Sequence, residues 1–570
     1  MPDRACWVIS TPDPSRVEAV AAALRVGTPL AKALIMRGVA DPCDARRYLA
    51  PSLADLLDPF AMRDMDRAVE RLRQAIRQGE RILIYGDYDV DGAAAVVILT
   101  KAIELAGGAA DWHVPHRLRD GYGMRPEVVE RAAAEGVRLI VSVDTGIRAA
   151  AVVERANQLG MDVIVTDHHL PEANLPPAFA VLNPNRPDCE YPDKNLCGAG
   201  VAFKLAQALI ATLDWPDDKY SRVAESFLKM VAIATVADVV PLTGENRIMV
   251  KHGLSGLATV RNPGLRALLD AAGFTGTRVP NARQVAFQIA PRLNAAGRMD
   301  TAQAAIELFL TSDARRASEL AARLQEQNAE RQQAEGEIRE MCERLAADQP
   351  GAALVYYAEE WHRGVLGIVA SRLADRLYRP VFVLGRNPDD GLAQGSGRSI
   401  PAFHLLEALE AMPDLFVRFG GHRHAAGVTL DASRVEEFRE RLCAYAAARL
   451  APEDFEPKLE VDGVIDFDDI NERTVAELFA LAPFGHSNPL PLFAALNVEV
   501  AGPPVAWNEK HLRIILRQNG RSLALKAWNF ATRASELTAG ARVDAAFSLE
   551  EDTGFGWTAV LRDVRAASGK

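Results

Sequence analysis

The sequence predicts an α/β protein with a parallel-sheet α/β domain, a smaller α/β domain joined to it by a long helix, and a small β-barrel. Three observations predict this fold class. Strands alternate with helices from Arg81, the stretch from Ser312 to Ala347 is charged and nearly without helix breakers, and short strands follow Phe455. At about 150 residues per domain, the 570 residues fit three to four domains.

Residues 1–78 are predicted to be mainly helical and to pack on the first α/β domain, residues 79–311. In that domain, short apolar runs end in acidic or polar residues, and helical stretches follow them. Parallel sheets of this kind bind ligands beyond the carboxyl ends of their strands. The predicted strands are Arg81–Tyr85, Arg138–Val143 and Asp162–Thr166, and the helices include Ala93–Ala106 and Ala149–Leu159.

Residues 312–350 are predicted to form a helix that bridges two domains, because the stretch is too polar for a core. Residues 351–452 repeat the α/β pattern, and prolines then mark a linker. Residues 455–570 are predicted to form a β-barrel of the OB type, because short strands follow one another between turns. Those strands are Val498–Val500, Leu512–Leu516, Leu523–Ala527, Val543–Ser548 and Trp557–Leu561.

The composition is that of an ordinary globular protein, with 49% hydrophobic and 25% charged residues. No apolar run reaches the roughly 18 residues of a transmembrane helix, and the N-terminus lacks the pattern of a secretory signal. The six cysteines form no CxxC pair, which argues against a zinc ribbon or a disulfide framework and fits a reducing cytoplasm.

Three aspartates, Asp87, Asp89 and Asp91, alternate directly after the first predicted strand. In an extended segment they point to one side, and their mutual repulsion calls for cations. An EF-hand loop is excluded, because residues 93–99 supply no further oxygen ligands. A solvated aspartate-rich turn is the alternative.

Further candidate ligands end the next two predicted strands, Asp144 and then His168 and His169, and a later apolar, helix-like segment carries one acid, Asp238. Each alone is weak, since a strand-end Asp commonly caps a helix. Together they place carboxylates and an imidazole at one sheet edge, which suits Mg²⁺ or Mn²⁺ better than zinc. This many carboxylates can hold two ions about 3.5–4 Å apart, the arrangement used for phosphoester hydrolysis.

At these residues the sequence resembles the DHH phosphoesterase superfamily, and within it the exonucleases specific for single-stranded DNA. The resemblance covers nearly the whole chain. It implies a DHH domain, a DHHA1 domain and an OB-like domain. The matching segments are GDYDVDG (86–92), SVDTG (142–146), TDHH (166–169), VADVVPL (236–242), APRLNAAGRM (290–299), WHRGVLGIVASRL (361–373), GSGRS (395–399) and GGHRHAAG (420–427).

The resemblance implies 5′-to-3′ degradation of single-stranded DNA to 5′-mononucleotides in repair and recombination, with two divalent cations, Mn²⁺ or Mg²⁺. Asp144 would bridge the cations and His169 would lie beside the scissile phosphate. Asp87 would be a ligand or would hold one, and Asp167 is expected to orient its loop. The implied metal ligands are Asp89, Asp91, Asp144, His168 and Asp238.

Two further groups of residues are candidates for substrate contacts. The glycines around Ser396 and Arg398 would let a 5′-phosphate approach donors, although a glycine turn with a solvated arginine is the alternative. Arg298, His422 and His424 are further candidates. In the OB-like domain a basic, aromatic stretch suits backbone tracking and base stacking, and a barrel core with a solvated face is the alternative. Its residues are Trp507, Lys510, Arg513, Arg517 and Lys526, with Arg521, Trp528, Phe530 and Arg533 interleaved or adjacent.

The net charge of −11 argues against a nucleic-acid partner when taken alone. Two bound divalent cations would offset part of it, and segments 395–399 and 507–533 are locally basic. We therefore expect the remaining acidity to face away from DNA.

Two alternatives remain: a DHH phosphodiesterase for oligonucleotides or cyclic dinucleotides, and a non-catalytic DNA-binding scaffold. The resemblance further implies a monomer in the bacterial cytoplasm, associated with the nucleoid. Its implied partners are single-stranded DNA, a single-strand-binding protein and a helicase of the RecQ type, with no membrane.

Overall fold

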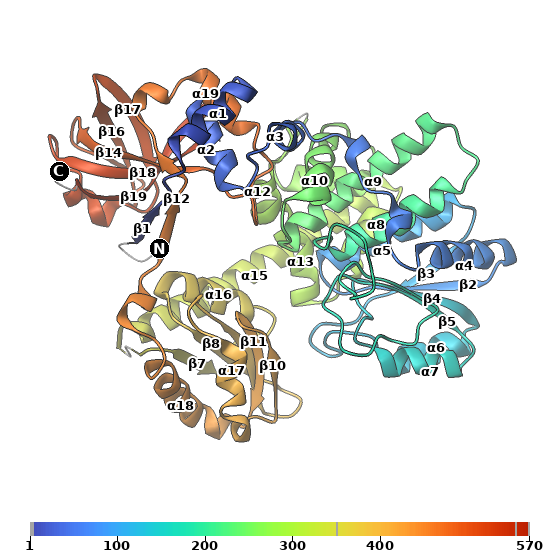
Figure 1. The fold of residues 1–570 in the computed structure, drawn as a ribbon. Coiled ribbons are helices and arrows are strands. Elements are labelled where there is room, and N and C mark those ends of the chain that lie inside the picture. The colour runs from blue at the N-terminus through green and yellow to red at the C-terminus, as the bar shows by residue number, and fades with distance from the viewer. Residues whose placement is uncertain (1–4, 277, 349–350, 553–555, 568–570) are drawn as a thin grey trace.

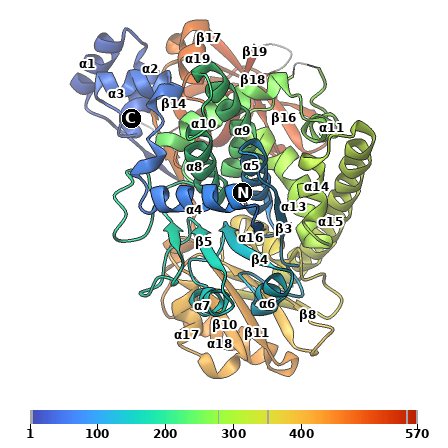
Figure 2. The ribbon, with the colours of Figure 1, turned by 90° about the vertical axis from the view of Figure 1, so that its right-hand side faces the viewer.

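The computed structural model describes residues 5–276, 278–348, 351–552 and 556–567. The first α/β domain forms one lobe, and the second α/β domain and the C-terminal β domain form two others, as Figure 1 shows. The long helix α15 (Ala314–Asp348) packs on α11 (Pro263–Ala271) and α13 (Ala290–Met299) of the first domain and on α16 (Leu366–Leu377) of the second. Figure 2 shows α15 along the edge of the molecule beside α14 (Gln303–Leu310).

The first domain contains a five-stranded parallel sheet in the order β3-β2-β4-β5-β6. In β2, Ile82 and Ile84 face one hydrophobic core and Leu83 and Tyr85 the other, as strand alternation requires. Helices α4, α5 and α8 cover the first face, and α6 and α7 cover the second. The strands are β2 (Arg81–Tyr85), β3 (Ala110–His113), β4 (Val137–Val143), β5 (Asp162–Thr166) and β6 (Ala180–Leu182); the helices are α4 (Met65–Gln78), α5 (Val90–Leu105), α6 (Pro126–Ala134), α7 (Ala150–Gln158) and α8 (Gly198–Ala211).

Between this sheet and α15 the chain is helical. A π-helical turn, Val285–Ile289, leads directly into α13, so the two form one continuous rod. The helices are α9 (Asp217–Ala237), α10 (Gly244–Gly256), α11 (Pro263–Ala271), α12 (Ala282–Gln284), α13 (Ala290–Met299) and α14 (Gln303–Leu310).

The second domain has a mixed sheet in the order β10-β11-β9-β8-β7, in which β7 and β8 are parallel and the other pairs antiparallel. Helix α16 packs on β8 and β9 and also on α15. The strands are β7 (Leu354–Ala358), β8 (Val381–Arg386), β9 (Ala393–Arg398), β10 (Arg418–Gly421) and β11 (Ala425–Leu430); the helices are α16 (Leu366–Leu377), α17 (Leu405–Glu410) and α18 (Val435–Ala447).

The C-terminal domain has a sheet in the order β13-β14-β18-β19-β17-β16-β15, and an additional pairing of β14 with β16 closes it into a barrel. Helix α19 (Glu472–Phe479) packs on its core. The strands are β13 (Gly463–Val464), β14 (Leu492–Val500), β15 (Val505–Trp507), β16 (His511–Gln518), β17 (Arg521–Ala527), β18 (Arg542–Asp552) and β19 (Gly556–Ala566). The closed barrel agrees with the predicted OB type.

The N-terminal region differs from the prediction. Its first helices pack on the C-terminal β domain, because apolar residues of α2 and α3 join that domain's core. The strand β1 pairs with β12, which directly precedes the barrel strands in the sequence, and Lys32 of α2 donates a hydrogen bond to the Val464 carbonyl. Only the later part, including α4, packs on the first α/β domain. The bounds are β1 (Cys6–Ile9), α1 (Pro14–Leu24), α2 (Thr28–Met36), α3 (Pro42–Leu49) and β12 (Lys458–Val461).

In the described part of the chain no single helix has the length and apolarity to cross a membrane, and α1 with α2 reaches them only as a pair bent by 111°.

Candidate metal centre and phosphate pocket

The carboxyl ends of β2, β4 and β5 meet at one edge of the sheet. The chain places β3 on one side of β2 and β4 on the other, so the order in which strands are added reverses between β2 and β4. Open α/β sheets bind ligands at such a point. The predicted ligands follow these strands and therefore gather there, and Asp238 joins them from the end of α9.

Two of the aspartates are fixed by backbone amides. The Asp89 carboxylate accepts hydrogen bonds from the amides of Asp91 and Gly92 and so caps α5. The Asp91 carboxylate accepts from the amides of Gly198 and Ala199, at 2.6 and 2.8 Å, at the N-terminus of α8. Both side chains are thus held before any ion binds.

Asp144 lies at the centre of the site in a left-handed backbone conformation, with φ 58°. Asp tolerates this backbone region better than most residues. The left-handed conformation ends the extended path of β4 at Asp144. Gly198 packs against it so closely that a Cβ there would lie 2.5 Å from the Asp144 Cβ. A glycine is therefore required at position 198.

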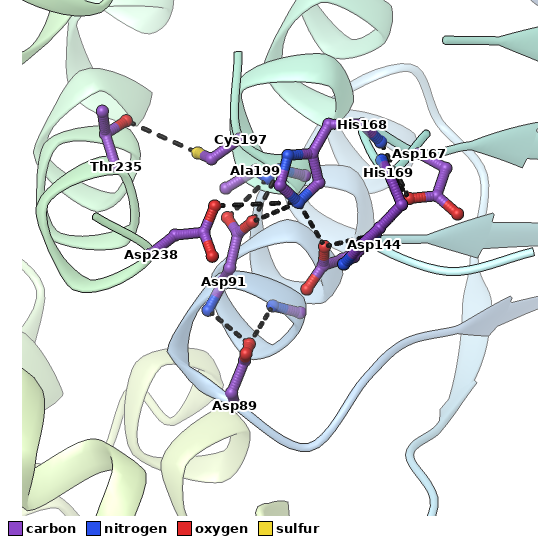
Figure 3. Close-up of polar contacts among 12 residues, drawn as sticks. Asp89, Asp91, Asp144, Asp167, His168, His169, Cys197, Ala199, Thr235 and Asp238 are labelled. Atoms are coloured by element: carbon purple, nitrogen blue, oxygen red, sulfur yellow. Dashed lines mark hydrogen bonds and ion pairs between the residues drawn. The ribbon is translucent and has the colours of Figure 1, made fainter. Parts of the chain in front are cut away.

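Figure 3 shows His168 among three of these carboxylates. Its Nε2 lies 3.3 Å from Asp144 Oδ1, 3.7 Å from Asp238 Oδ2 and 3.9 Å from Asp91 Oδ2. Burial lowers the pKa of His168, so the imidazole is neutral, the form that binds a metal.

The site meets the chemical requirements for divalent cations. Buried polar atoms without a hydrogen-bond partner converge on it from four side chains: Asp87 Oδ1, Asp144 Oδ1, His168 Nε2 and Asp238 Oδ2. Such atoms are costly unless something compensates them. Burial, followed by repulsion from Asp91 and Asp89, raises the pKa of Asp238 to about 9, and burial also raises the pKa of Asp87, Asp91 and Asp144.

Three groups of ligand atoms each lie within 4.8 Å of one another: Asp91 with His168 and Asp238, Asp87 with Asp89 and Asp144, and Asp144 with His168 and His169. Asp144 and His168 each belong to two of them, and Asp144 is the carboxylate that does so. The geometry therefore allows neighbouring cations that share Asp144.

His169 is oriented by Asp167. His169 Nδ1 lies 2.7 Å from Asp167 Oδ1, and the same carboxylate accepts from the amides of Ile147, His168 and His169. Burial alone would lower the pKa of His169, but the hydrogen bond and the charge of Asp167 outweigh it and raise the pKa. The position of Asp167 agrees with the predicted orienting role. The Tyr122 hydroxyl, 3.2 Å from His169 Nδ1, was not predicted.

Next to the metal centre lies a basic pocket of about 430 Å³ between the two α/β domains. It brings together Arg298 from α13 with Ser396 and Arg398 from β9, as predicted, and no Asp or Glu is among the described residues that line it. Arg117 and Arg363 also line it and were not predicted. Burial, then repulsion by Arg117, lowers the pKa of Arg398, as expected for crowded cations without an anion.

The pocket and the metal centre share a segment of chain. Tyr88 lines the pocket and stands between Asp87 and Asp89 in the sequence. Arg117 lies over the Tyr88 ring, with its guanidinium carbon 4.8 Å from the ring centre. A phosphate in this pocket would thus lie beside the metal ligands.

His422 and His424 do not line this pocket. They lie at the turn between β10 and β11, where the His424 carbonyl accepts from the Ser399 amide. The turn is therefore beside the end of β9, and a substrate contact by these histidines stays a prediction.

The β domain carries an exposed aromatic cluster. The Trp507, His511 and Trp528 rings lie 4.8–5.3 Å apart between centres, and Arg513 lies over Trp507. Trp528 is 46% exposed, which excludes it from the barrel core, whereas Phe530 is buried there.

The remaining predicted basic residues of this domain differ in their environment. Lys526 is paired with Asp552 and Arg517 with Glu499, so part of their charge is already compensated. Lys510 follows the β15 strand, beside the aromatic cluster. The basic face is therefore smaller than the sequence indicated.

The residues that sequence reasoning missed come from segments far apart in the chain. Arg117 and Tyr122 follow β3, a half-exposed strand without a long apolar run, so the strand and its loop gave little signal. Arg363 lies within the WHRGVLGIVASRL segment, where the resemblance alone could have indicated it.

The fold and the site define a DHH phosphoesterase. The models of the DHH family N-terminal domain, the DHHA1 domain and the RecJ OB domain match residues 81–235, 351–448 and 461–559. The chain belongs to the RecJ family.

Among similar relatives, the single-stranded-DNA-specific exonuclease RecJ of Bacillus subtilis is 38% identical over 94% of this chain and 67% of its own length. The RecJ of Escherichia coli is 37% identical over 83% of this chain and 84% of its own length. The structure of Thermus thermophilus RecJ in complex with Mn²⁺ matches 99% of this chain and 80% of that protein, with 33% identity and a TM-score of 0.83. The Mg²⁺ complex of the same protein matches with a TM-score of 0.77.

Proposed function

We propose that this chain is a metal-dependent 5′-to-3′ exonuclease that degrades single-stranded DNA to 5′-mononucleotides. One observation supports it most directly: Tyr88 joins the basic pocket to the carboxylate cluster. A terminal 5′-phosphate bound by the arginines would place the next phosphodiester at the metal ligands. Cleavage there releases one nucleotide from the 5′ end.

Asp89, Asp91, Asp144, His168 and Asp238 would hold two divalent cations, Mn²⁺ or Mg²⁺, with Asp87 beside them. When bound, such ions acidify an attacking water and stabilise negative charge on the phosphate. His169, whose pKa is raised by the hydrogen bond and charge of Asp167, would when protonated add a hydrogen-bond donor and a positive charge beside the scissile phosphate. The arginines of the pocket hold the 5′-phosphate in line with these groups.

The OB-like domain would bind the strand beyond the metal centre. The Trp507, His511 and Trp528 cluster offers stacking surfaces for bases, and Arg513 and Lys510 offer cations for phosphates. Stacking of bases on these aromatic rings requires unpaired bases, so this domain would favour single strands over duplex.

The alternatives fit less well. A non-catalytic scaffold would not need the full set of ligands that converge here, and each predicted metal ligand carries a competent side chain. A phosphodiesterase for small substrates would not need the exposed aromatic cluster of a separate β domain. A role in DNA repair and recombination in the bacterial cytoplasm at the nucleoid, with a single-strand-binding protein and a RecQ-type helicase as partners, is part of this proposal.

The test is Asp144→Ala, because Asp144 belongs to two of the ligand groups. Hydrolysis of a 5′-phosphorylated single strand with Mn²⁺ should fall by at least about a thousandfold, while the circular dichroism spectrum stays unchanged. Retained metal-dependent hydrolysis by the folded variant would contradict the assignment.

A further inference from the structure

The connecting helix α15 contains a buried carboxylate outside the metal centre. Glu335 is 2% exposed and lies where α15 passes from the first α/β domain to the second. Its Oε2 accepts from Arg331 of the same helix at 3.0 Å, and its Oε1 lies 2.6 Å from Arg372 Nε of α16. One buried side chain therefore ties α15 to a helix of the second domain.

Helix α16 is also a wall of the basic pocket. Gly367, Ile368 and Ser371 from its first turns line the pocket, and Arg372 is the next residue. Neighbouring residues of a helix point in different directions, so Ser371 faces the pocket while Arg372 faces Glu335. The ion pair thus restrains the rotation of α16 about its axis and its position along α15.

Arg331 connects the same network to the opposite wall. Helix α15, which carries Arg331, packs on α13, which carries Arg298, and the charge of Arg331 contributes, after burial and Arg117, to lowering the pKa of Arg298 to about 9. Its own charge is compensated by Glu335 and by a hydrogen bond to Asn328 Oδ1 at 3.1 Å. Glu335 therefore lies on α15, which packs on the Arg298 helix α13, and pairs with α16, the helix that carries Ser371.

We propose that Glu335 and Arg372 are a positioning pair that sets the separation of the two walls of the 5′-phosphate pocket. This inference rests on the proposed function of the pocket. Neither residue touches the substrate; they act through α16 and α15. The recognition of a terminal phosphate then depends on an ion pair outside the pocket.

The experiment uses Arg372→Gln in the full chain. Arg372 is 49% exposed, and its loss leaves Glu335 paired with Arg331, so the protein should fold. We expect the KM for a 5′-phosphorylated strand to rise about tenfold with kcat within about twofold, because a displaced wall weakens binding without touching the reacting groups. The KM for a 5′-hydroxyl strand should stay nearly unchanged.

The matched control is Arg376→Gln. Arg376 lies one turn further along α16 and pairs with Glu343 of α15 at 2.7 Å, so it is a second ion pair between the same helices outside the pocket lining. It should leave the preference for a 5′-phosphate unchanged. Arg372→Lys, which keeps the charge, should restore most of that preference.

An unchanged KM ratio in Arg372→Gln, an equal loss in Arg376→Gln, or no rescue by Arg372→Lys would overturn the positioning pair. Arg398→Ala separates the two levels of the argument, since it removes a pocket donor directly. If Arg398→Ala lowers the 5′-phosphate preference and Arg372→Gln does not, only the positioning pair fails. If the unmodified protein shows no such preference, the pocket assignment and the positioning pair both fail.

Discussion

Replacing Asp238 by Asn should stabilise the metal-free protein, although it removes a proposed metal ligand. The pKa of Asp238 is raised to about 9 by burial and by Asp91 and Asp89. Below the unfolded pKa of 3.8 the carboxyl is protonated in both states and does not destabilise the fold. As the pH rises toward 9, the unfolded state loses this proton more readily than the folded state, so the folded state is progressively destabilised. Asn carries no charge and avoids this destabilisation.

The size of the effect follows from the same shift. At roughly pH 7.5 the largest destabilisation that this pKa shift can cause is about 5 kcal/mol, at about 1.36 kcal/mol per pH unit above the unfolded pKa. Solvent reaches 23% of the side chain, and the repulsion is shared with neighbouring carboxylates. We therefore expect the free energy of unfolding to rise by about 1–2 kcal/mol in Asp238→Asn.

The assay is urea unfolding in EDTA at two pH values, with the exposed Asp214→Asn as the control. The gain should be larger at about pH 8 than at about pH 5.5. Adding Mn²⁺ should reverse the order, because an ion at 100 times its Kd stabilises the unmodified protein by about 2.7 kcal/mol. A variant no more stable than the unmodified protein in EDTA, or a gain that falls with pH, would refute the electrostatic account of the site.

Three further predictions concern other parts of the molecule. Arg117→Ala should lower kcat/KM for a 5′-phosphorylated strand about tenfold and leave a 5′-hydroxyl strand nearly unaffected, measured by initial rates. Gly336→Ala should raise the free energy of unfolding by about 1 kcal/mol, because Gly336 lies inside α15 and an added Cβ meets no atom within 4 Å; equal or lower stability would contradict it. Trp528→Ala should weaken binding of a long single strand by about 1–3 kcal/mol in fluorescence anisotropy and leave the hydrolysis of a trinucleotide unchanged.

The sequence allowed the main sheet to be predicted, together with the carboxylates and histidines that meet at its edge. The strands Arg81–Tyr85 and Asp162–Thr166 have the predicted bounds, because a parallel strand buried on both faces is a continuous apolar run. The proposed ligands follow such strands directly, and the parallel order brings their ends together. Local pattern and one topological rule were therefore enough for this edge of the sheet.

The remaining features depend on contacts between distant segments. The apolar faces of α2 and α3 are visible in the sequence, but the pattern does not say which core they join, and they join the barrel core. The pocket combines Arg117, Arg298 and Arg398 from three separate elements, so its shape depends on how the two α/β domains meet. That arrangement is fixed by α15 and its buried Glu335.

The most direct test of the central claim is a time course on a 3′-labelled single strand and its duplex, each with Mn²⁺ or EDTA. The account predicts that, with Mn²⁺, the labelled single strand shortens stepwise from its 5′ end and 5′-mononucleotides are released. The duplex should persist, and EDTA should stop the reaction. Release of the labelled 3′ nucleotide at the earliest times, equal cleavage of the duplex, or hydrolysis in EDTA would contradict the account.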